Sequence, residues 1–578
     1  MTAFDLPPSK EKQIRDHLSF LYGEQVSGSL LDRLRTLLQS YYPVIQRPES
    51  SELSEKDIVL ITYADQLTSP DEPPLKTLEA FLSEYLTDLV TTIHILPFYP
   101  YSSDDGFSVI DYRQVNPAFG DWSHIQEMRE KFKLMFDAVI NHISAKSDWF
   151  QGFLRNEPPY NEYFITVDPE TDLSSIVRPR DLPLLTSFQT SQGDRHLWTT
   201  FSTDQIDLNF ANPEVLMEIL DLLLYYIEKG ASIIRLDAIA FLWKEIGSTS
   251  IHLPQTHRII KIMRAIVDHI APHVLLLTET NVPHEENISY FGTGEDEAHM
   301  VYQFALPPLI LHTLVAGDAS RLSNWAATLD RPSEKVTFFN FTASHDGIGV
   351  RPARNILTEQ EIKTLTRRVE DHGGGISYRR IGEHARQAYE LNINYFDALN
   401  STNEIQHDLQ RTVNRFLCSQ AIMLAFPGLP AIYFHSLFGS RNDPEGVEKT
   451  GHLRSINRQK FSRQSFEAEL CRPHTRRNLV FQGYQRLLKA RRGHAAFNPW
   501  GGHEVLPIDP KIFAILRYES QESPKVLCLH EIAGKPFEFN GTLETGLPFA
   551  GEDLLTGEKI QFDTLTLQPY QACWIQLE

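Results

Sequence analysis

The chain has little cysteine, a deficit of basic residues and no long apolar run. Four cysteines among 578 residues, without a CxxC pair, are too few to cross-link the fold and lack zinc-site spacing. Lysine and arginine number 54 against 75 acidic residues, a net charge of −21, whereas nucleic-acid binding needs a basic surface. No stretch approaches the roughly 20 apolar residues of a membrane helix, and the first residues carry charges and prolines where a secretion signal needs an apolar core. We therefore expect a cytoplasmic protein that binds neither nucleic acid nor membrane, and the oligomeric state stays open.

From residue 56 onward, short apolar segments rich in β-branched residues alternate with segments of helical periodicity. This alternation predicts an α/β fold, namely a (β/α)8 TIM barrel. The eight strand-like segments are DIVLITYAD, TTIHILPFYP, KLMFDAVINH, ASIIRLDA, HVLLLTETN, HMVYQFALPP, KVTFFNFTASHD and LPAIYFHSL.

Four parts of the chain do not fit a plain barrel. Two gaps, after strands three and seven, are longer than a simple crossover, so we expect two insertions that overhang the C-terminal face of the barrel. The start of the chain has helical spacing, and after about residue 495 short strand-like segments replace the helices. The expected division is a helical extension (1–55), barrel (56–142), inserted subdomain B (143–212), barrel (213–346), inserted loop subdomain (347–410), barrel end (411–494) and small antiparallel β-domain (495–578).

Polar residues gather where the strand-like segments end, which is the side of a parallel barrel on which chemistry occurs. Arg235 and Asp237 lie two apart at the end of ASIIRLDA, so both point to one side. Alone they would indicate a structural ion pair, but carboxylates and histidines lie in other segments as well. These are Asp137 in the middle and His142 at the end of the third segment, Glu279 near the end of the fifth, and His345 and Asp346 at the end of the seventh. Two carboxylates at one mouth are the apparatus for cleaving a glycosidic bond.

Four of these segments, DAVINH, GASIIRLDA, TETN and FTASHD, resemble in order and spacing the signature segments of the α-amylase clan of retaining glycosidases. PFYPYSSDDGFSVIDY, IVRPRDLPLLT and RSINR resemble its sucrose-phosphorylase branch, and the N-terminal extension resembles the members that act on glucosylglycerol and glucosylglycerate. The resemblance implies that Asp237 is the nucleophile, Glu279 the acid/base and Asp346 the stabiliser of the transition state. Residues that match the glucose pocket of the family are Asp104, Phe107, His142, Arg235, His345 and Arg458.

The expected protonation states follow from the neighbours of the two carboxyl groups. Asp237 beside a guanidinium should have a lowered pKa and stay ionised. Glu279 must hold a proton to act as an acid, so burial and nearby carboxylates should raise its pKa. The mechanism requires neither a cofactor nor a metal, and inorganic phosphate is a substrate. Asn141 matches a calcium ligand of some amylases, yet no calcium is expected in this branch.

A glucosyl-enzyme ester can be resolved by phosphate, by water or by another alcohol, and phosphate needs fixed cations. Arg178 and Arg180 match the RPR motif of the family, and Tyr389 matches a tyrosine that shares its phosphate role. These matches favour a phosphorylase over hydrolysis or glucosyl transfer. An inactive barrel serving as a binding or transporter subunit is the alternative of another class, and the intact catalytic set disfavours it.

The acceptor side departs from the sucrose phosphorylases at Thr280, Asn281, Gln387 and Glu390, which we expect to surround the leaving group. These changes disfavour sucrose and sucrose 6′-phosphate and favour an α-glucoside of a three-carbon acceptor. A carboxylate at Glu390 would repel an acid, so glucosylglycerol is the favoured substrate and glucosylglycerate the close second. The arginines that could instead bind a glycerate carboxylate are Arg379, Arg380 and Arg386.

Overall fold

A computed structural model describes residues 6–46, 52–381, 385–539 and 550–577. Within these residues, eight parallel strands close into a barrel, and neighbours around the barrel follow one another in the chain. The predicted (β/α)8 barrel is therefore confirmed. Its strands are β1 (Val59–Thr62), β3 (Thr92–Ile95), β4 (Lys133–Ala138), β9 (Ala231–Leu236), β10 (Leu275–Thr278), β11 (Met300–Tyr302), β12 (Thr337–Asn340) and β16 (Leu429–Tyr433).

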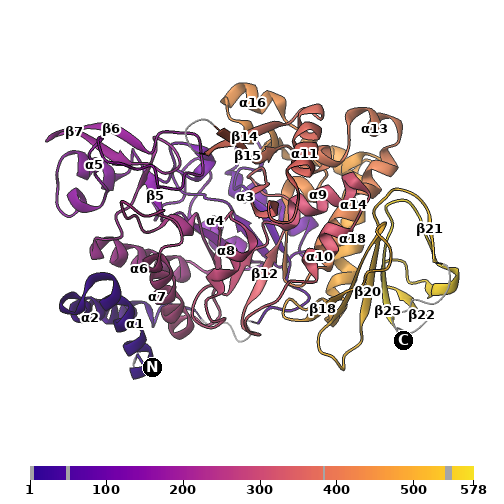
Figure 1. The fold of residues 1–578 in the computed structure, drawn as a ribbon, viewed down its shortest axis with the longest axis horizontal. Coiled ribbons are helices and arrows are strands. Elements are labelled where there is room, and N and C mark those ends of the chain that lie inside the picture. The colour runs from indigo at the N-terminus through magenta and orange to yellow at the C-terminus, as the bar shows by residue number, and fades with distance from the viewer. Residues whose placement is uncertain (1–5, 47–51, 382–384, 540–549, 578) are drawn as a thin grey trace.

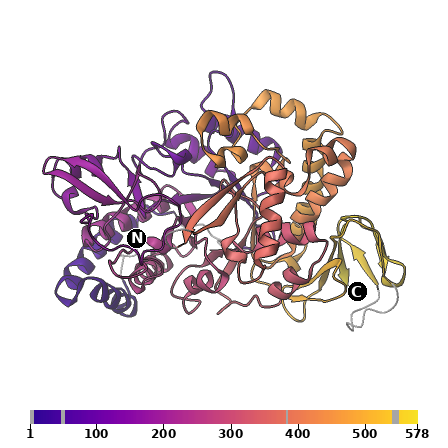
Figure 2. The same ribbon diagram turned by 45° about the horizontal axis from the view of Figure 1, so that its top comes forward.

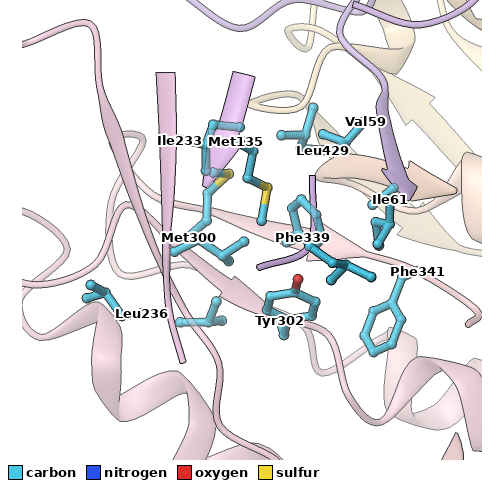
Figure 3. Packing of buried hydrophobic residues seen from close by; sticks show 14 of the residues in the cluster. Val59, Ile61, Met135, Ile233, Leu236, Met300, Tyr302, Phe339, Phe341 and Leu429 are labelled. Carbon is cyan, nitrogen blue, oxygen red and sulfur yellow. The ribbon is translucent and has the colours of Figure 1, made fainter. Parts of the chain in front are cut away.

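The barrel strands are mostly apolar because both of their faces are covered. Figure 3 shows side chains from several strands packed together, among them Ile61, Met135 and Phe339. Parallel pairing also sets which residues lie level with one another at the barrel mouth. Arg235 of β9 is paired with Asp137 of β4. The register of two buried strands thus places a cation beside a carboxylate before any loop contributes.

Helices on the outside of the barrel connect its strands (Figure 1). The helix that precedes β9 illustrates the local signals, since Asn212 caps it through a 3.0 Å bond from the Glu214 N–H and Pro213 occupies its first turn. The main helices are α3 (Pro74–Tyr85), α4 (Trp122–Arg129), α6 (Pro213–Glu228), α7 (Pro254–Ile270), α8 (His284–Ile288), α9 (Leu306–Ala316), α10 (Ser320–Ala326), α14 (Leu409–Ala425) and α18 (Arg476–Arg492).

Two long excursions leave the barrel after β4 and after β12, and both lie over the same side of it (Figures 1 and 2). They touch each other through an ion pair of 2.9 Å between Arg386 and Asp181. The first contains β5 (His142–Ser144), α5 (Asp148–Leu154), β6 (Leu185–Thr190), β7 (Gly193–Trp198) and β8 (Gln205–Asp207). The second contains β13 (Ile348–Gly349), the short helix η5 (Arg351–Ala353), α11 (Glu359–Asp371), β14 (Gly375–Ile381) and β15 (Ala385–Asn392).

The two ends of the chain form separate layers at opposite ends of the molecule (Figure 1). Helices α1 (Pro8–Tyr22) and α2 (Glu24–Tyr41) pack beside α7 and α6. The expected C-terminal antiparallel sheet is present, with strands β18 (Gly502–Val505), β19 (Ile512–Tyr518), β20 (Val526–Glu531), β25 (Ala572–Leu577), β22 (Ala550–Asp553) and β23 (Lys559–Gln561) in spatial order. Among the residues described, no helix has the length and apolar character needed to span a membrane.

Candidate active site

A cavity at the C-terminal mouth of the barrel collects residues from strand ends and from both insertions. Residues singled out in the sequence that line it are Asp104, Phe107, His142, Arg180, Asp237, Glu279, Thr280, Asn281, His345, Asp346 and Tyr389. Lining residues that the sequence interpretation missed include Phe201, Gln205, Arg351 and Arg454.

A fully buried arginine holds Asp237 in place. Arg235 Nη1 donates to Asp237 Oδ1 at 2.7 Å and to Asp137 Oδ1 at 2.5 Å. The second oxygen of Asp137 lies 2.7 Å from His94 Nε2. Because Asp137 is itself held, the arginine cannot swing away, and Asp237 is oriented through it. The sequence interpretation gave Asp137 no role, although its place at a strand end was visible.

The protonation of Asp237 differs from the expectation. Burial raises the pKa of Asp237 above its ordinary value, although Arg235 and His142 act in the opposite direction. The expectation of a lowered pKa was therefore wrong, because it counted the guanidinium and not the loss of water around the carboxyl group. Arg235 lies closer to Asp237, at 2.7 Å, than to Glu279, at 4.0 Å, so its charge acts more strongly on Asp237.

A backbone donor points at Glu279 from the turn that follows Asp237. Ala238 has a left-handed conformation (φ 47°), and its N–H donates to Glu279 Oε2 at 2.9 Å. Burial raises the pKa of Glu279 to about 7; Arg235, 4.0 Å from the same oxygen, opposes the rise, whereas Asp237 and Asp346 add to it. Glu279 therefore exchanges a proton near neutral pH, as an acid and base in turn must.

One wall of the cavity is a flat stack. The rings of Phe107 and His345 lie 4.5 Å apart at an interplanar angle of 6°. Arg458 fixes this wall from behind, since its Nε donates to the His345 carbonyl at 2.9 Å. Burial opposes ionisation of Asp104, but Arg180 and Arg458 outweigh it and lower the pKa of Asp104 to about 2. An ionised carboxylate beside a flat apolar wall suits a sugar ring with its hydroxyl groups.

Asp346 is held by an arginine that the sequence interpretation overlooked. Arg454, in the short helix η6 (Leu453–Asn457), lies 2.5 Å from Asp346 Oδ1 and 2.9 Å from Glu390 Oε1. Against the effect of burial, Arg454 and His345 keep the pKa of Asp346 well below its usual range. Asp346 thus stays ionised at every working pH. Arg454 belongs to the RSINR segment that also contains Arg458, so the signal for it was present.

An ammonium occupies the position at which calcium would be considered. Lys244 Nζ is buried and lies 2.7 Å from Asn141 Oδ1 and 2.8 Å from Asp207 Oδ2. The same aspartate accepts the Thr200 N–H at 2.9 Å. Because the Lys244 ammonium already occupies these oxygens, they do not fit a binding site for a divalent metal ion. The Lys244 ammonium also links Asn141, which precedes His142 at the barrel mouth, to Asp207 in the first insertion.

Three residues assigned to the phosphate or acceptor group do not line the cavity. Arg178 donates to the Leu182 carbonyl, and Gln387 accepts from Arg379 at 3.0 Å. Glu390 is buried, paired with Arg454 and bonded at 3.0 Å to the Gly347 N–H.

The interpretation of Glu390 as a negative charge facing the acceptor was therefore wrong, because its carboxylate is buried and accepts hydrogen bonds from Arg454 and the Gly347 N–H instead of lining the cavity. Of the arginines considered for glycerate, Arg379 bonds Gln387 and Arg386 pairs with Asp181. Arg380 lies outside the residues whose side chains are described.

Comparisons with known proteins show which sequences this chain is similar to. The alpha-amylase catalytic-domain model matches residues 82–347. The chain is 48% identical over 571 residues to the glucosylglycerate phosphorylase of Allomeiothermus silvanus, a match that covers 99% of each chain. It is 27% identical over 459 residues to the glucosylglycerol phosphorylase of Marinobacter adhaerens, which covers 77% of this chain and 90% of the relative.

A solved structure shows the same arrangement of the chain. The crystal structure of sucrose 6F-phosphate phosphorylase from Thermoanaerobacter thermosaccharolyticum matches with a TM-score of 0.72 and 26% identity, over 83% of this chain and 94% of that one. The relative from Allomeiothermus silvanus covers the barrel, both insertions and both terminal layers. The chain therefore belongs to the α-amylase family, within its branch of glucoside phosphorylases.

Proposed function

We propose that this enzyme is a retaining phosphorylase that converts glucosylglycerate and phosphate into α-glucose 1-phosphate and glycerate. The reaction type rests on two carboxyl groups that line the same cavity. Asp237 is oriented by Arg235, and the pKa of Glu279 is raised to about 7. This pairing supplies a fixed nucleophile and a carboxyl group that can lose and regain a proton at neutral pH.

In the first step, an oxygen of Asp237 attacks the anomeric carbon of glucose. The bond from that carbon to the acceptor oxygen breaks, and Glu279 gives its proton to the departing oxygen. Arg235 binds Oδ1 of Asp237, so Oδ2 is the oxygen that attacks. Asp346, kept ionised by Arg454, stabilises the positive charge that develops on the sugar.

In the second step, a phosphate oxygen attacks the same carbon and releases Asp237, while Glu279 takes up the proton that the phosphate loses. Two inversions leave the α configuration unchanged. Arg180 and Tyr389, one from each insertion, line the cavity and are our candidates for binding phosphate. Arg180 lies 3.5 Å from Asp104, so it reaches the edge of the sugar site.

The choice of glycerate over glycerol rests on two observations. Glu390 is buried and hydrogen-bonded to Arg454 and does not line the cavity, which removes the reason for favouring an uncharged acceptor. Relatives that match nearly the whole chain at 45–48% identity are glucosylglycerate phosphorylases, whereas the glucosylglycerol phosphorylase of Marinobacter adhaerens is 27% identical. The first observation removes the objection to an acidic acceptor, and the second supports one.

The test is a panel of glucosylglycerate, glucosylglycerol and sucrose at equal concentration, each with and without phosphate. We expect the largest kcat/KM with glucosylglycerate and glucose 1-phosphate as the phosphate-dependent product. Release of free glucose at an equal rate without phosphate would indicate a hydrolase. No turnover of any donor in either condition would favour the inactive binding subunit.

A further inference from the structure

The arginines around the cavity differ in how fully their charge is matched. Arg235 contacts two carboxylates, Asp137 and Asp237. Arg454 likewise contacts Asp346 and Glu390, and Arg458 contacts Asp104 and Asp105. The positive charge of each of these guanidinium groups is thus balanced by carboxylates of the protein itself.

Arg351 differs from them. Its side chain lines the cavity and is only 11% exposed. Within the described residues, the one carboxylate within 4 Å of it is Glu286, at 3.4 Å, and that side chain is 44% exposed. Because this ion pair is long and Glu286 is partly exposed, most N–H donors of the Arg351 guanidinium remain available to a ligand. Arg351 is therefore a buried cation with spare donors facing a ligand cavity.

Arg351 also lies on the side where the leaving group must be. The leaving oxygen receives its proton from Glu279, and Asn281 lies two residues further along the chain. Gly349 packs so closely on Asn281 that an added Cβ would lie 2.7 Å from Asn281 Oδ1. Two residues after Gly349 comes Arg351, and the intervening Val350 N–H donates to the Tyr389 carbonyl at 3.0 Å.

We infer that Arg351 binds the carboxylate of the acceptor and thereby selects a glucoside of a hydroxy acid over the corresponding glucoside of a neutral polyol. The inference rests on the proposed function, because it concerns the acceptor of that reaction. A carboxylate fits the guanidinium fork in a way that a hydroxymethyl group does not. Glycerol in the same place would leave the donors of a buried cation unsatisfied.

Glu286 can leave Arg351 without becoming a buried, unpaired carboxylate. It also contacts His252, with 3.2 Å between Glu286 Oε2 and His252 Nε2, and its carboxylate reaches solvent. When a substrate carboxylate takes its place on Arg351, Glu286 keeps one partner and its water. The substrate carboxylate thus replaces the Glu286 carboxylate on Arg351, and the guanidinium keeps one negatively charged partner.

The test compares Arg351→Gln with Arg354→Gln. Arg354 is a matched control because its side chain is also 11% exposed and lies three residues away, but it pairs with Glu359 and does not line the cavity. The measurement is the ratio of kcat/KM for glucosylglycerate to kcat/KM for glucosylglycerol. We expect Arg351→Gln to lower this ratio about 10- to 100-fold, the range of a charge-assisted hydrogen bond, and Arg354→Gln to leave it at the wild-type value.

One further variant and the substrate preference of the wild type distinguish a failure of the Arg351 role from a failure of the proposed function. Arg351→Lys keeps the charge without the planar fork, so it should give an intermediate ratio and carries the test if Arg351→Gln does not fold. A wild type that prefers glucosylglycerate, together with an unchanged ratio in both Arg351 variants, would refute the role of Arg351 and leave the proposed function intact. A raised KM for phosphate with an unchanged ratio would make Arg351 a phosphate ligand instead. A wild type that prefers glucosylglycerol would overturn the proposed substrate and this inference together.

Discussion

The pKa of Glu279 gives the sharpest quantitative prediction. A rise from the ordinary value of 4.5 to about 7 corresponds to about 3 kcal/mol in favour of the protonated form. Cleavage of the glucoside needs that proton, so kcat/KM for the glucoside should fall on the alkaline side of about pH 7. At pH 8 about a tenth of the enzyme would carry the proton, and at pH 9 about a hundredth.

The assay must report the first step alone. In a double displacement, kcat/KM for the glucoside contains only the steps up to the glucosyl-enzyme, so titration of phosphate in the same pH range does not enter. Glucosylglycerate itself has no group that titrates between pH 6 and 9. Initial rates of glycerate release over that range should therefore fall tenfold for each unit above about pH 7.

α-Glucosyl fluoride provides the control, because fluoride leaves without a proton. Its kcat/KM should lack the alkaline fall, since that donor does not need the acid form of Glu279. An equal fall with both donors would show that another group titrates. A profile for the glucoside that stays flat to pH 9 would refute the assignment of Glu279 as the acid.

Three further predictions concern particular side chains. Asp237→Asn should lower kcat on the order of 10⁴-fold or more with every donor, measured as glucose 1-phosphate release, because the amide cannot form the ester; a near-normal rate would exclude Asp237 as nucleophile. Lys244→Met should lower the free energy of unfolding by about 3–5 kcal/mol, because Asp207 loses its buried counter-charge; denaturant unfolding measures this, and an unchanged midpoint would contradict the pairing. Glu390→Gln should lower kcat/KM about tenfold for glucosylglycerate and glucosylglycerol alike, because it acts through Arg454; a selective gain with glucosylglycerate would mean that the carboxylate faces the acceptor after all.

The barrel and the positions of the main carboxylates could be predicted because both follow from local patterns. Strand and helix periodicities are short-range, and parallel strands bring all their C-terminal ends to one face. Asp237 and Glu279 therefore had to share a mouth once the strands were recognised.

The electrostatics and the acceptor side could not be predicted in the same way. The rise in the pKa of Asp237 comes from burial, which depends on all the surrounding atoms rather than on its neighbour Arg235. Glu390 and Arg454 are 64 residues apart and meet through a hairpin and a short helix without periodic signals. Arg351 comes 11 residues after the end of β12, in a loop without periodic signals, and its place in the cavity wall depends on how that loop packs against residues such as Asn281.

The central claim is that Asp237 and Glu279 carry out a double displacement that transfers glucose from glucosylglycerate to phosphate. Proton NMR of a fresh reaction of the enzyme with glucosylglycerate and phosphate tests it most directly. The account predicts glucose 1-phosphate in the α configuration, together with an equal amount of glycerate. A β-configured phosphate would show a single displacement, and free glucose in place of the phosphate ester would show that water, not phosphate, resolves the intermediate.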